Sequence, residues 1–334
     1  MMRGIRWIAA WIGMLGIWMS AGALSSCHRY TEPEQIYPVS AIGFDGVDSG
    51  VRVTVEIPVV GGETLSDSKA MRFSQTGADV RDALRSMETG LPRALIFSHC
   101  ALAVLGDSLS KEQMQEIFAF AGVEDGLPLA AEVVICPNAE QLLAAQPLSS
   151  IAVGYEIPQI LEQERERRGA ELPCEIYQLR AIVSPDLPVA IPRLDMNGEG
   201  EGMSSVRFAG LDILRPHDNS YRLAVSDCTP YAILTDTCTG GVWDGGQWRM
   251  LQTQVRVDEN GQLQIFLRLE MTGGRQGACD ALAAELKQST EELYRRVRED
   301  VEEDLFLLEE RMARQGLKWE GQQTVTVHCE VVVK

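Results

Sequence analysis

The sequence has little of what most enzyme active sites depend on. Its 334 residues hold only four histidines, and the signatures GxSxG, HExxH, GxGxxG and the phosphate-binding loop are missing. The eight cysteines are scattered, with no CxxC pair and no Cys/His spacing of a zinc site. These absences predict that the chain is not an enzyme and that it holds no metal or other non-covalent cofactor.

Three histidines are candidates for a catalytic or zinc-binding role. His99 lies inside the apolar run IFSHCALAV, and we interpret it as a hydrogen-bonded core or strand-end histidine. A catalytic base there would need an orienting carboxylate, which no local motif supplies. His217 falls in a hairpin loop and His328 on a strand, and a zinc site built from them would need four ligands without local spacing.

Long apolar runs are confined to the N-terminus. Two arginines open the chain, an apolar stretch continues to Leu24, and Ser25, Ser26 and Cys27 follow. A charged start, an apolar core and small residues before a cleavage site are the parts of a secretory signal. The sequence Leu24-Ser25-Ser26-Cys27 resembles the lipobox of bacterial lipoproteins, whose cysteine thiol forms a thioether to diacylglycerol. A retained single-pass anchor is the alternative, because spanning takes roughly 20 apolar residues.

Cleavage before Cys27 would leave a lipidated cysteine as the N-terminus. Each buried CH2 group contributes about 0.8 kcal/mol, so two acyl chains hold a protein firmly on a membrane. Cleavage also removes two positive charges and no negative one, which takes the net charge from −18 to −20. We therefore expect an acidic body on the outer face of the cytoplasmic membrane, tethered by lipid, with no nucleic acid as a partner.

The other seven cysteines are an odd number and form no disulfide framework. Cys100 and Cys136 lie in apolar segments and are predicted to be small core residues. Cys228 and Cys238 are close enough in sequence to bridge, but buried free thiols are favoured.

Composition divides the chain into five parts. The boundaries are 1–26 for the signal peptide, 27–35 for the lipidated N-terminus and spacer, 36–184 for an N-terminal α/β region, 185–204 for a Pro/Gly-rich connector, and 205–334 for a C-terminal α+β domain.

Hydrophobic periodicity places the elements. In the N-terminal region we expect strands at 36–44 and 51–60, a loop at 61–76, a helix at 80–91, a strand at 94–105, a helix at 111–121, a strand at 129–136, a short helix capped by Asn138, a helix ending at 169 and a strand at 175–183. In the C-terminal domain we expect strands at 205–214 and 220–225, a helical turn at 229–237, strands at 247–257 and 262–271, one long helix at 279–315 and a strand at 324–333.

The fold class that these elements predict is α+β, with several small domains of mostly antiparallel sheet packed with helices. One apolar stripe on the long helix is explained by packing across the C-terminal sheet, and its acidic pairs by a salt-bridged, solvated face. Aromatic residues gather around Gly240–Gly246: Tyr221, Tyr231, Trp243 and Trp248. Hairpin packing is favoured for them, with a carbohydrate or protein contact as the alternative.

The order of these parts resembles the Ger(x)C family, the C-subunit lipoproteins of bacterial spore germinant receptors. The pieces that carry the resemblance are LSSC, AIGFD followed by VRVTVEI, ADVRDALRSMETGLPRALIFSHCALAVLGDSL, GLDIL, and the charged helix ELYRRVREDVEEDLFLLEERMARQGL. The chain departs from the family's pattern in having His28-Arg29-Tyr30 after Cys27, where Trp-Asp is usual, and only a short passage between the long helix and the last strand.

The resemblance implies three small α+β domains and a lipid on Cys27. It also implies a place beside an integral membrane, permease-like subunit and a second receptor subunit at the spore inner membrane, in nutrient sensing that triggers germination. It transfers no ligand-binding residue. The expected function is therefore a membrane-tethered, non-catalytic receptor subunit, and the alternative is a surface lipoprotein that captures a small solute directly.

Overall fold

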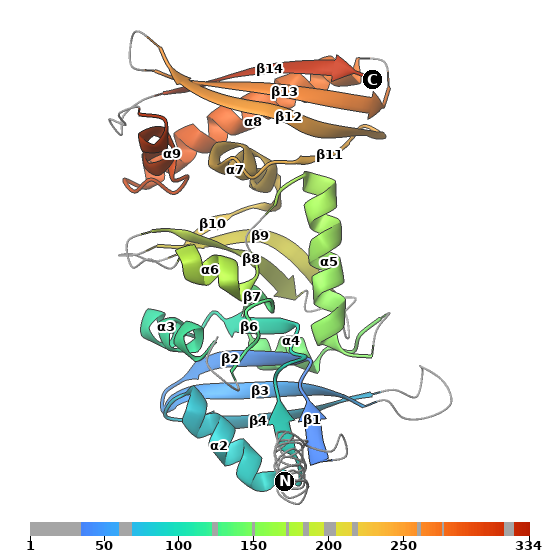
Figure 1. Cartoon of the computed structure of the whole chain (residues 1–334), viewed down its shortest axis with the longest axis vertical. Coiled ribbons are helices and arrows are strands. Elements are labelled where there is room, and N and C mark those ends of the chain that lie inside the picture. Colours follow the sequence, from blue (N-terminus) through green and yellow to red (C-terminus); the bar gives the residue numbers. More distant parts are fainter. Residues whose placement is uncertain are drawn as a thin grey trace, which may run out of the picture.

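The structure is a computed structural model in which the arrangement of the elements can be followed from Ile36 to the last strand. It describes residues 35–59, 69–121, 126–148, 151–171, 174–182, 187–196, 205–215, 220–258, 262–275, 277–316 and 324–334. The predicted signal peptide, Leu24, Ser25, Ser26 and Cys27 lie outside these residues, as does His217. Figure 1 shows the elements stacked along one long axis, with N-terminal elements at one end and the C-terminal sheet at the other.

An eight-stranded mixed sheet runs through the N-terminal and middle parts of the stack, in the order β10-β9-β8-β7-β6-β2-β3-β4 (Figure 1). The pairs β2–β6, β6–β7 and β7–β8 are parallel, and the remaining pairs are antiparallel. Its strands are β2 (Ala41–Val47), β3 (Gly50–Val59), β4 (Lys69–Gly77), β6 (Leu102–Gly106), β7 (Glu132–Cys136), β8 (Val189–Met196), β9 (Val206–Leu214) and β10 (Tyr221–Leu223). A separate parallel pair joins β1 (Ile36–Pro38) to β5 (Ala94–Ile96).

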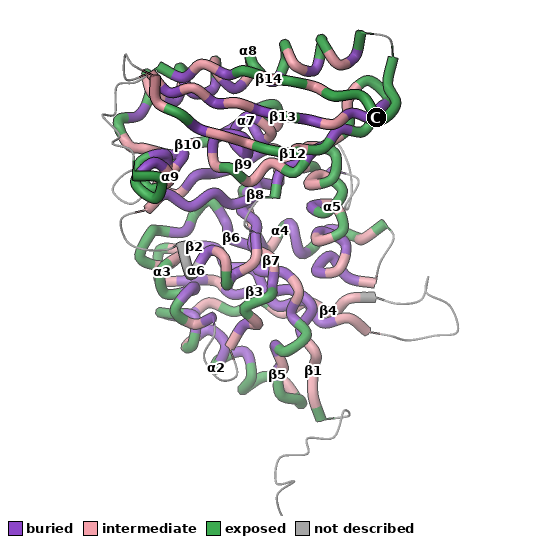
Figure 2. The backbone as a smooth tube through the Cα atoms, turned by 45° about the horizontal axis from the view of Figure 1, so that its top comes forward, coloured by how far each residue is buried: buried purple, intermediate pink, exposed green. Residues whose placement is uncertain are grey.

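Helices cover both faces of the large sheet. One face shares a core with α2, α3 and α6, and the opposite face shares a core with α4 and α5. Figure 2 shows the buried residues concentrated along the strands between these helices. The helices are α2 (Val80–Gly90), α3 (Lys111–Phe120), α4 (Ala139–Ala144), α5 (Val153–Arg168) and α6 (Ile176–Ile182).

Local signals set the helix starts as the sequence predicts. The side chain of Asp79 accepts the backbone N–H of Asp82, and Asn138 accepts that of Gln141. Ser110 and Gln113 form a reciprocal capping box at the start of α3. These side chains satisfy backbone donors that have no partner within the helix.

The C-terminal sheet has the order β11-β12-β13-β14, with β14 parallel to β13 and the other pairs antiparallel. Its elements are α7 (Cys228–Thr235), β11 (Gly240–Trp243), β12 (Gly246–Val257), β13 (Leu263–Gly273), α8 (Ala278–Asp300), α9 (Leu308–Arg314) and β14 (Val325–Val333). The buried stripe of α8 packs with this sheet and also with Leu211 and Ile213 of β9, so one core joins the C-terminal and middle parts. The α+β fold class is confirmed.

The long C-terminal helix is shorter than predicted. The backbone leaves the helical conformation at Val301, and α9 begins only after Leu307, which has a φ of 54°. The carboxylate of Asp304 accepts the backbone N–H groups of Phe306 at 3.2 Å and Glu309 at 2.7 Å, which stabilises the break. Because Leu305, Leu308 and Met312 are still fully buried, the apolar stripe alone cannot distinguish one helix from two.

The predicted connector at 185–204 is wrong for residues 189–196, which form β8. Pro192 is tolerated because a register shift follows at once, between Arg193 and Leu194, and because β8 pairs with β7 at a single position. The apolar side chains of β8 fill the cores on both faces of the sheet.

Three further predictions are corrected by the structure. The run 94–105 is two strands separated by a turn, in which the N–H of Cys100 donates to Phe97 O at 2.8 Å. The predicted loop at 61–76 contains β4, whose polar residues suit an edge strand with one open face. The predicted strand at 175–183 is α6, in which Ile176 and Leu179 are buried at helical spacing.

A buried ion-pair cluster holds the middle of the large sheet. Arg193 of β8 is only 2% exposed, and its guanidinium lies 2.7 Å from Asp107, 2.8 Å from Asp212 and 3.0 Å from Asp195. Arg222 of β10 also pairs with Asp212, at 3.0 Å. The cluster therefore ties the end of β6 to β8, β9 and β10.

We predict that Arg193→Met lowers the free energy of unfolding by about 3 kcal/mol, because it leaves the buried Asp212 carboxylate with one cation fewer. The matched control is Arg295→Met, which removes an exposed ion-pair residue and should change stability by less than about 1 kcal/mol. Urea unfolding followed by circular dichroism measures both, and equal effects would contradict the assignment.

Candidate functional site

The two described histidines, His99 and His328, belong to different sheets and form no common site. His99 was predicted in the core or at a strand end; it is exposed in the turn between β5 and β6, so the core placement is wrong. His328 stacks on Phe266 with ring centroids 4.7 Å apart, and its Nε2 lies 2.6 Å from Gln264 Oε1 on the open face of the C-terminal sheet. Among the described residues, no group of three or more His, Cys, Asp or Glu side chains could hold a metal ion.

The aromatic residues near Gly240–Gly246 mostly serve packing. Tyr231 and Phe306 lie 6.0 Å apart between ring centroids in the C-terminal core, and Trp248 is buried in β12. Tyr221 donates a hydrogen bond to Asp300 at 2.7 Å. The interpretation as packing fits these contacts better than an open aromatic binding face.

The acidic pairs of α8 form a salt-bridged surface, as predicted. Arg295 lies 2.6 Å from Glu292 and 2.7 Å from Glu299, and Arg296 lies 2.7 Å from Asp227. The seven described cysteines are free. Burial raises the pKa of both the Cys228 and the Cys238 thiols to about 12, so neither is a reactive thiolate at neutral pH.

The best-defined polar arrangement surrounds the start of α5. Ala152, the N-cap residue, makes no side-chain cap, and the carboxylate of Glu56 on β3 takes that role from across the sheet. It accepts the N–H groups of Val153 at 3.0 Å and Gly154 at 2.8 Å, together with the hydroxyl of Ser40 at 3.0 Å. Arg72 lies 3.5 Å away. Burial raises the pKa of Glu56, opposed by these backbone donors and by Arg72.

A second strand carboxylate acts in the same way. Asp45 of β2 accepts the N–H groups of Ala139 at 2.8 Å and Glu140 at 2.9 Å at the start of α4. Neither role was predicted, because the alternation VRVTVEI assigns Glu56 to an open face, whereas helices cover both faces of β3. The available signal was an acidic residue within each of two strands rich in apolar residues.

The other end of α5 docks against the C-terminal domain (Figure 1). Gly169 terminates the helix with a φ of 60°, and its carbonyl accepts the N–H of Thr239 at 2.7 Å. The N–H of Glu171 donates to Thr237 O at 2.9 Å, and the hydroxyl of Thr229 donates to Arg168 O at 2.9 Å. Helix α5 therefore connects β3, at one end of the stack, to β11 at the other.

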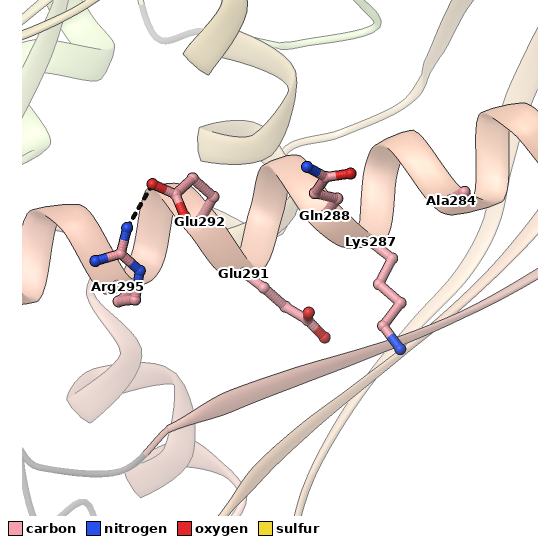
Figure 3. Close-up of a pocket in the computed structure, with 6 residues that line it drawn as sticks. All are labelled: Ala284, Lys287, Gln288, Glu291, Glu292 and Arg295. Carbon is pink, nitrogen blue, oxygen red and sulfur yellow. Dashed lines mark hydrogen bonds and ion pairs between the residues drawn. The ribbon is translucent and has the colours of Figure 1, made fainter.

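Two surface hollows accompany these elements. One of about 470 Å³ lies at the α5–β11 junction, between Gln163, Glu166 and Arg167 on the helix and Val242, Gln247 and Trp248 on the hairpin. The other, of about 410 Å³, follows the exposed side of α8 (Figure 3). Within the described part of the chain, no helix combines the length and apolar content that crossing a bilayer requires.

We predict that Gly169→Ala loosens the α5–β11 junction. A Cβ there would lie 0.7 Å from the carbonyl oxygen of Gly240, so the backbones must separate, at a cost of about 2–4 kcal/mol in unfolding free energy. Gly277→Ala is the matched control, because Gly277 also has a positive φ, of 82°, but open space around it, and should cost about 1 kcal/mol. Hydrogen exchange at α5 distinguishes the two, and equal exchange would contradict the assignment.

Comparison with known proteins agrees with the fold and the early motifs. The family model of the spore germination protein N-terminal domain matches residues 29–185. The crystal structure of the GerBC protein is similar with a TM-score of 0.50 and 11% identity, over 87% of this chain and 96% of that chain. No curated protein sequence matches significantly. Residues 29–185 are therefore similar to the N-terminal domain of spore germination proteins, and the chain shares the fold of GerBC along most of both chains.

Proposed function

We propose that the chain is a membrane-tethered, non-catalytic subunit of a nutrient germinant receptor complex. The match of residues 29–185 to the spore germination protein N-terminal domain supports the receptor role. The observation that carries the tether is the lipobox Leu24-Ser25-Ser26-Cys27 directly after an apolar leader. A diacylglyceryl group on Cys27 supplies the two acyl chains that firm membrane binding needs.

The tether would act at short range. Strand β1 begins at Ile36, nine residues after Cys27, and a chain of that length spans roughly 30 Å at most. The end of the stack that carries β1 and β3 would therefore stay near the bilayer. Confinement of this kind raises the effective concentration of a protein beside membrane partners, without any catalytic step.

The shared interior of the stack suits a scaffold. The C-terminal sheet, α8 and β9 share one core, and α5 is bonded at both of its ends. A partner bound to the C-terminal domain would thus be held at a fixed position relative to the membrane-proximal end. We propose that this subunit positions its partners, namely an integral membrane permease-like subunit and a second receptor subunit.

Direct capture of a small solute is the second candidate function. The hollow of about 470 Å³ at the α5–β11 junction favours it, because ligand pockets typically measure about 300–1,000 Å³. Thermal-shift measurements with amino acids and sugars separate the two functions. A saturable shift that Gln163→Ala abolishes would support capture, whereas the scaffold function expects no saturable shift.

We predict that Cys27→Ala moves the protein from the membrane to the soluble fraction and impairs nutrient-triggered germination, because the proposed acylation site is lost. Cys279→Ala is the control, since it removes a thiol of α8 and leaves the lipobox intact. Fractionation with immunoblotting, together with a germination assay, measures both effects. Unchanged membrane retention and germination in Cys27→Ala would count against the proposed function.

A further inference from the structure

The outer edge of β14 has backbone groups without a strand partner. In its parallel ladder with β13, the N–H of Leu263 donates to Thr324 O at 3.0 Å, and the N–H of Lys334 donates to Met271 O at 3.0 Å. Even-numbered residues of β14 therefore face β13, and odd-numbered residues direct their N–H and C=O groups outward. No strand of the described chain pairs with this edge.

Helix α8 supplies a hydrogen-bond acceptor only at the beginning of that edge. The carboxylate of Glu291 accepts the outward N–H of Val327 at 2.8 Å. Among the described residues, no side chain accepts the next outward N–H groups, those of Cys329 and Val331, and Val332 and Val333 are 37% and 69% exposed. Charges, bulges or covering segments usually keep natural edge strands from pairing with other chains. In this nine-residue strand, such protection covers one part only.

The side of α8 that carries Glu291 borders the beginning of this edge and lines a hollow of about 410 Å³. Figure 3 shows Lys287 and Glu291 extending from α8 toward the strands. In the described part of the chain, Lys287 has no ion-pair partner, whereas Arg295 is paired with Glu292 and Glu299. An unpaired strand edge is the feature to which several domains bind extended peptides by strand addition.

We propose that the outer edge of β14 accepts an extended segment of another subunit of the same receptor complex, as a fifth strand beside α8. This inference rests on the proposed function. The occupant must be a polypeptide backbone, because only a strand offers acceptors and donors at the repeat of the outward groups on Cys329 and Val331. The positive charge of Lys287 favours a segment that places a carboxylate on the side facing α8.

A second copy of this chain fits the edge less well. Each mature copy would carry a net charge of −20, so pairing two copies would bring two strongly acidic bodies together. A partner of a different sequence avoids that repulsion.

The first test compares Val331→Pro with Val331→Ala in the full-length, lipidated protein. Proline removes an outward N–H and leaves every ladder bond to β13, whereas alanine keeps the N–H and removes the same side chain. Membrane retention should be equal in both. Co-purification with the other receptor subunits from detergent extracts should fall about tenfold in Val331→Pro and remain near wild type in Val331→Ala.

The second test uses the exposed Lys287, whose substitution does not threaten folding. Lys287→Glu should also reduce co-purification severalfold, and Lys287→Arg should preserve it. A carbodiimide crosslinker should join Lys287 to an acidic residue of a receptor subunit, identified by peptide mass spectrometry.

The outcomes separate the inference from the proposed function. If Val331→Pro and Lys287→Glu co-purify with receptor subunits as wild type does, strand addition is overturned while the receptor role stands. Crosslinks that join two copies of this chain also overturn it. If the wild-type protein co-purifies with no receptor subunit, the proposed function fails and this inference fails with it.

Discussion

The architecture depends on a carboxylate of one strand holding the start of a helix that belongs to another part of the fold. Glu56 of β3 accepts the first N–H groups of α5, and the other end of α5 is bonded to the β11 region. A helix without its own N-cap side chain is thus fixed at both ends by distant residues. Because a buried carboxylate is costly unless hydrogen-bonded, this contact also specifies how α5 crosses the sheet.

The proposed tether would act through the connected interior of the stack. One end of the stack carries β1 and β3, and the other end carries the free edge of β14 (Figure 1). One core joins the C-terminal sheet to β9, and the Arg193 cluster joins β9 to the centre of the large sheet. Lipid at one end and partner contacts at the other would therefore be related by a connected interior, with no moving part or chemical step required.

Elements with strong local signals could be predicted from the sequence. The capped helices α2, α3 and α4 and the hairpin strands β12 and β13 follow from periodicity, caps and turns. Predictions failed where tertiary contacts determine the secondary structure. Strand β8 contains a proline yet forms a strand because its side chains pack in two cores. The apolar stripe of α8 continues through the break at Val301, so it does not reveal the end of the helix. The roles of Glu56 and Asp45 were hidden because their partners are backbone groups about 95 residues away. The resemblance to the germinant-receptor family came from the order of the parts, which no single residue determines.

Membrane attachment is the central proposal, and the mass of the mature N-terminal peptide tests it most directly. Protein isolated from spore membranes should yield a peptide that begins at Cys27 and carries a diacylglyceryl group, with the 26 preceding residues absent. An unmodified Cys27 thiol, or a peptide that still contains the leader, would contradict it.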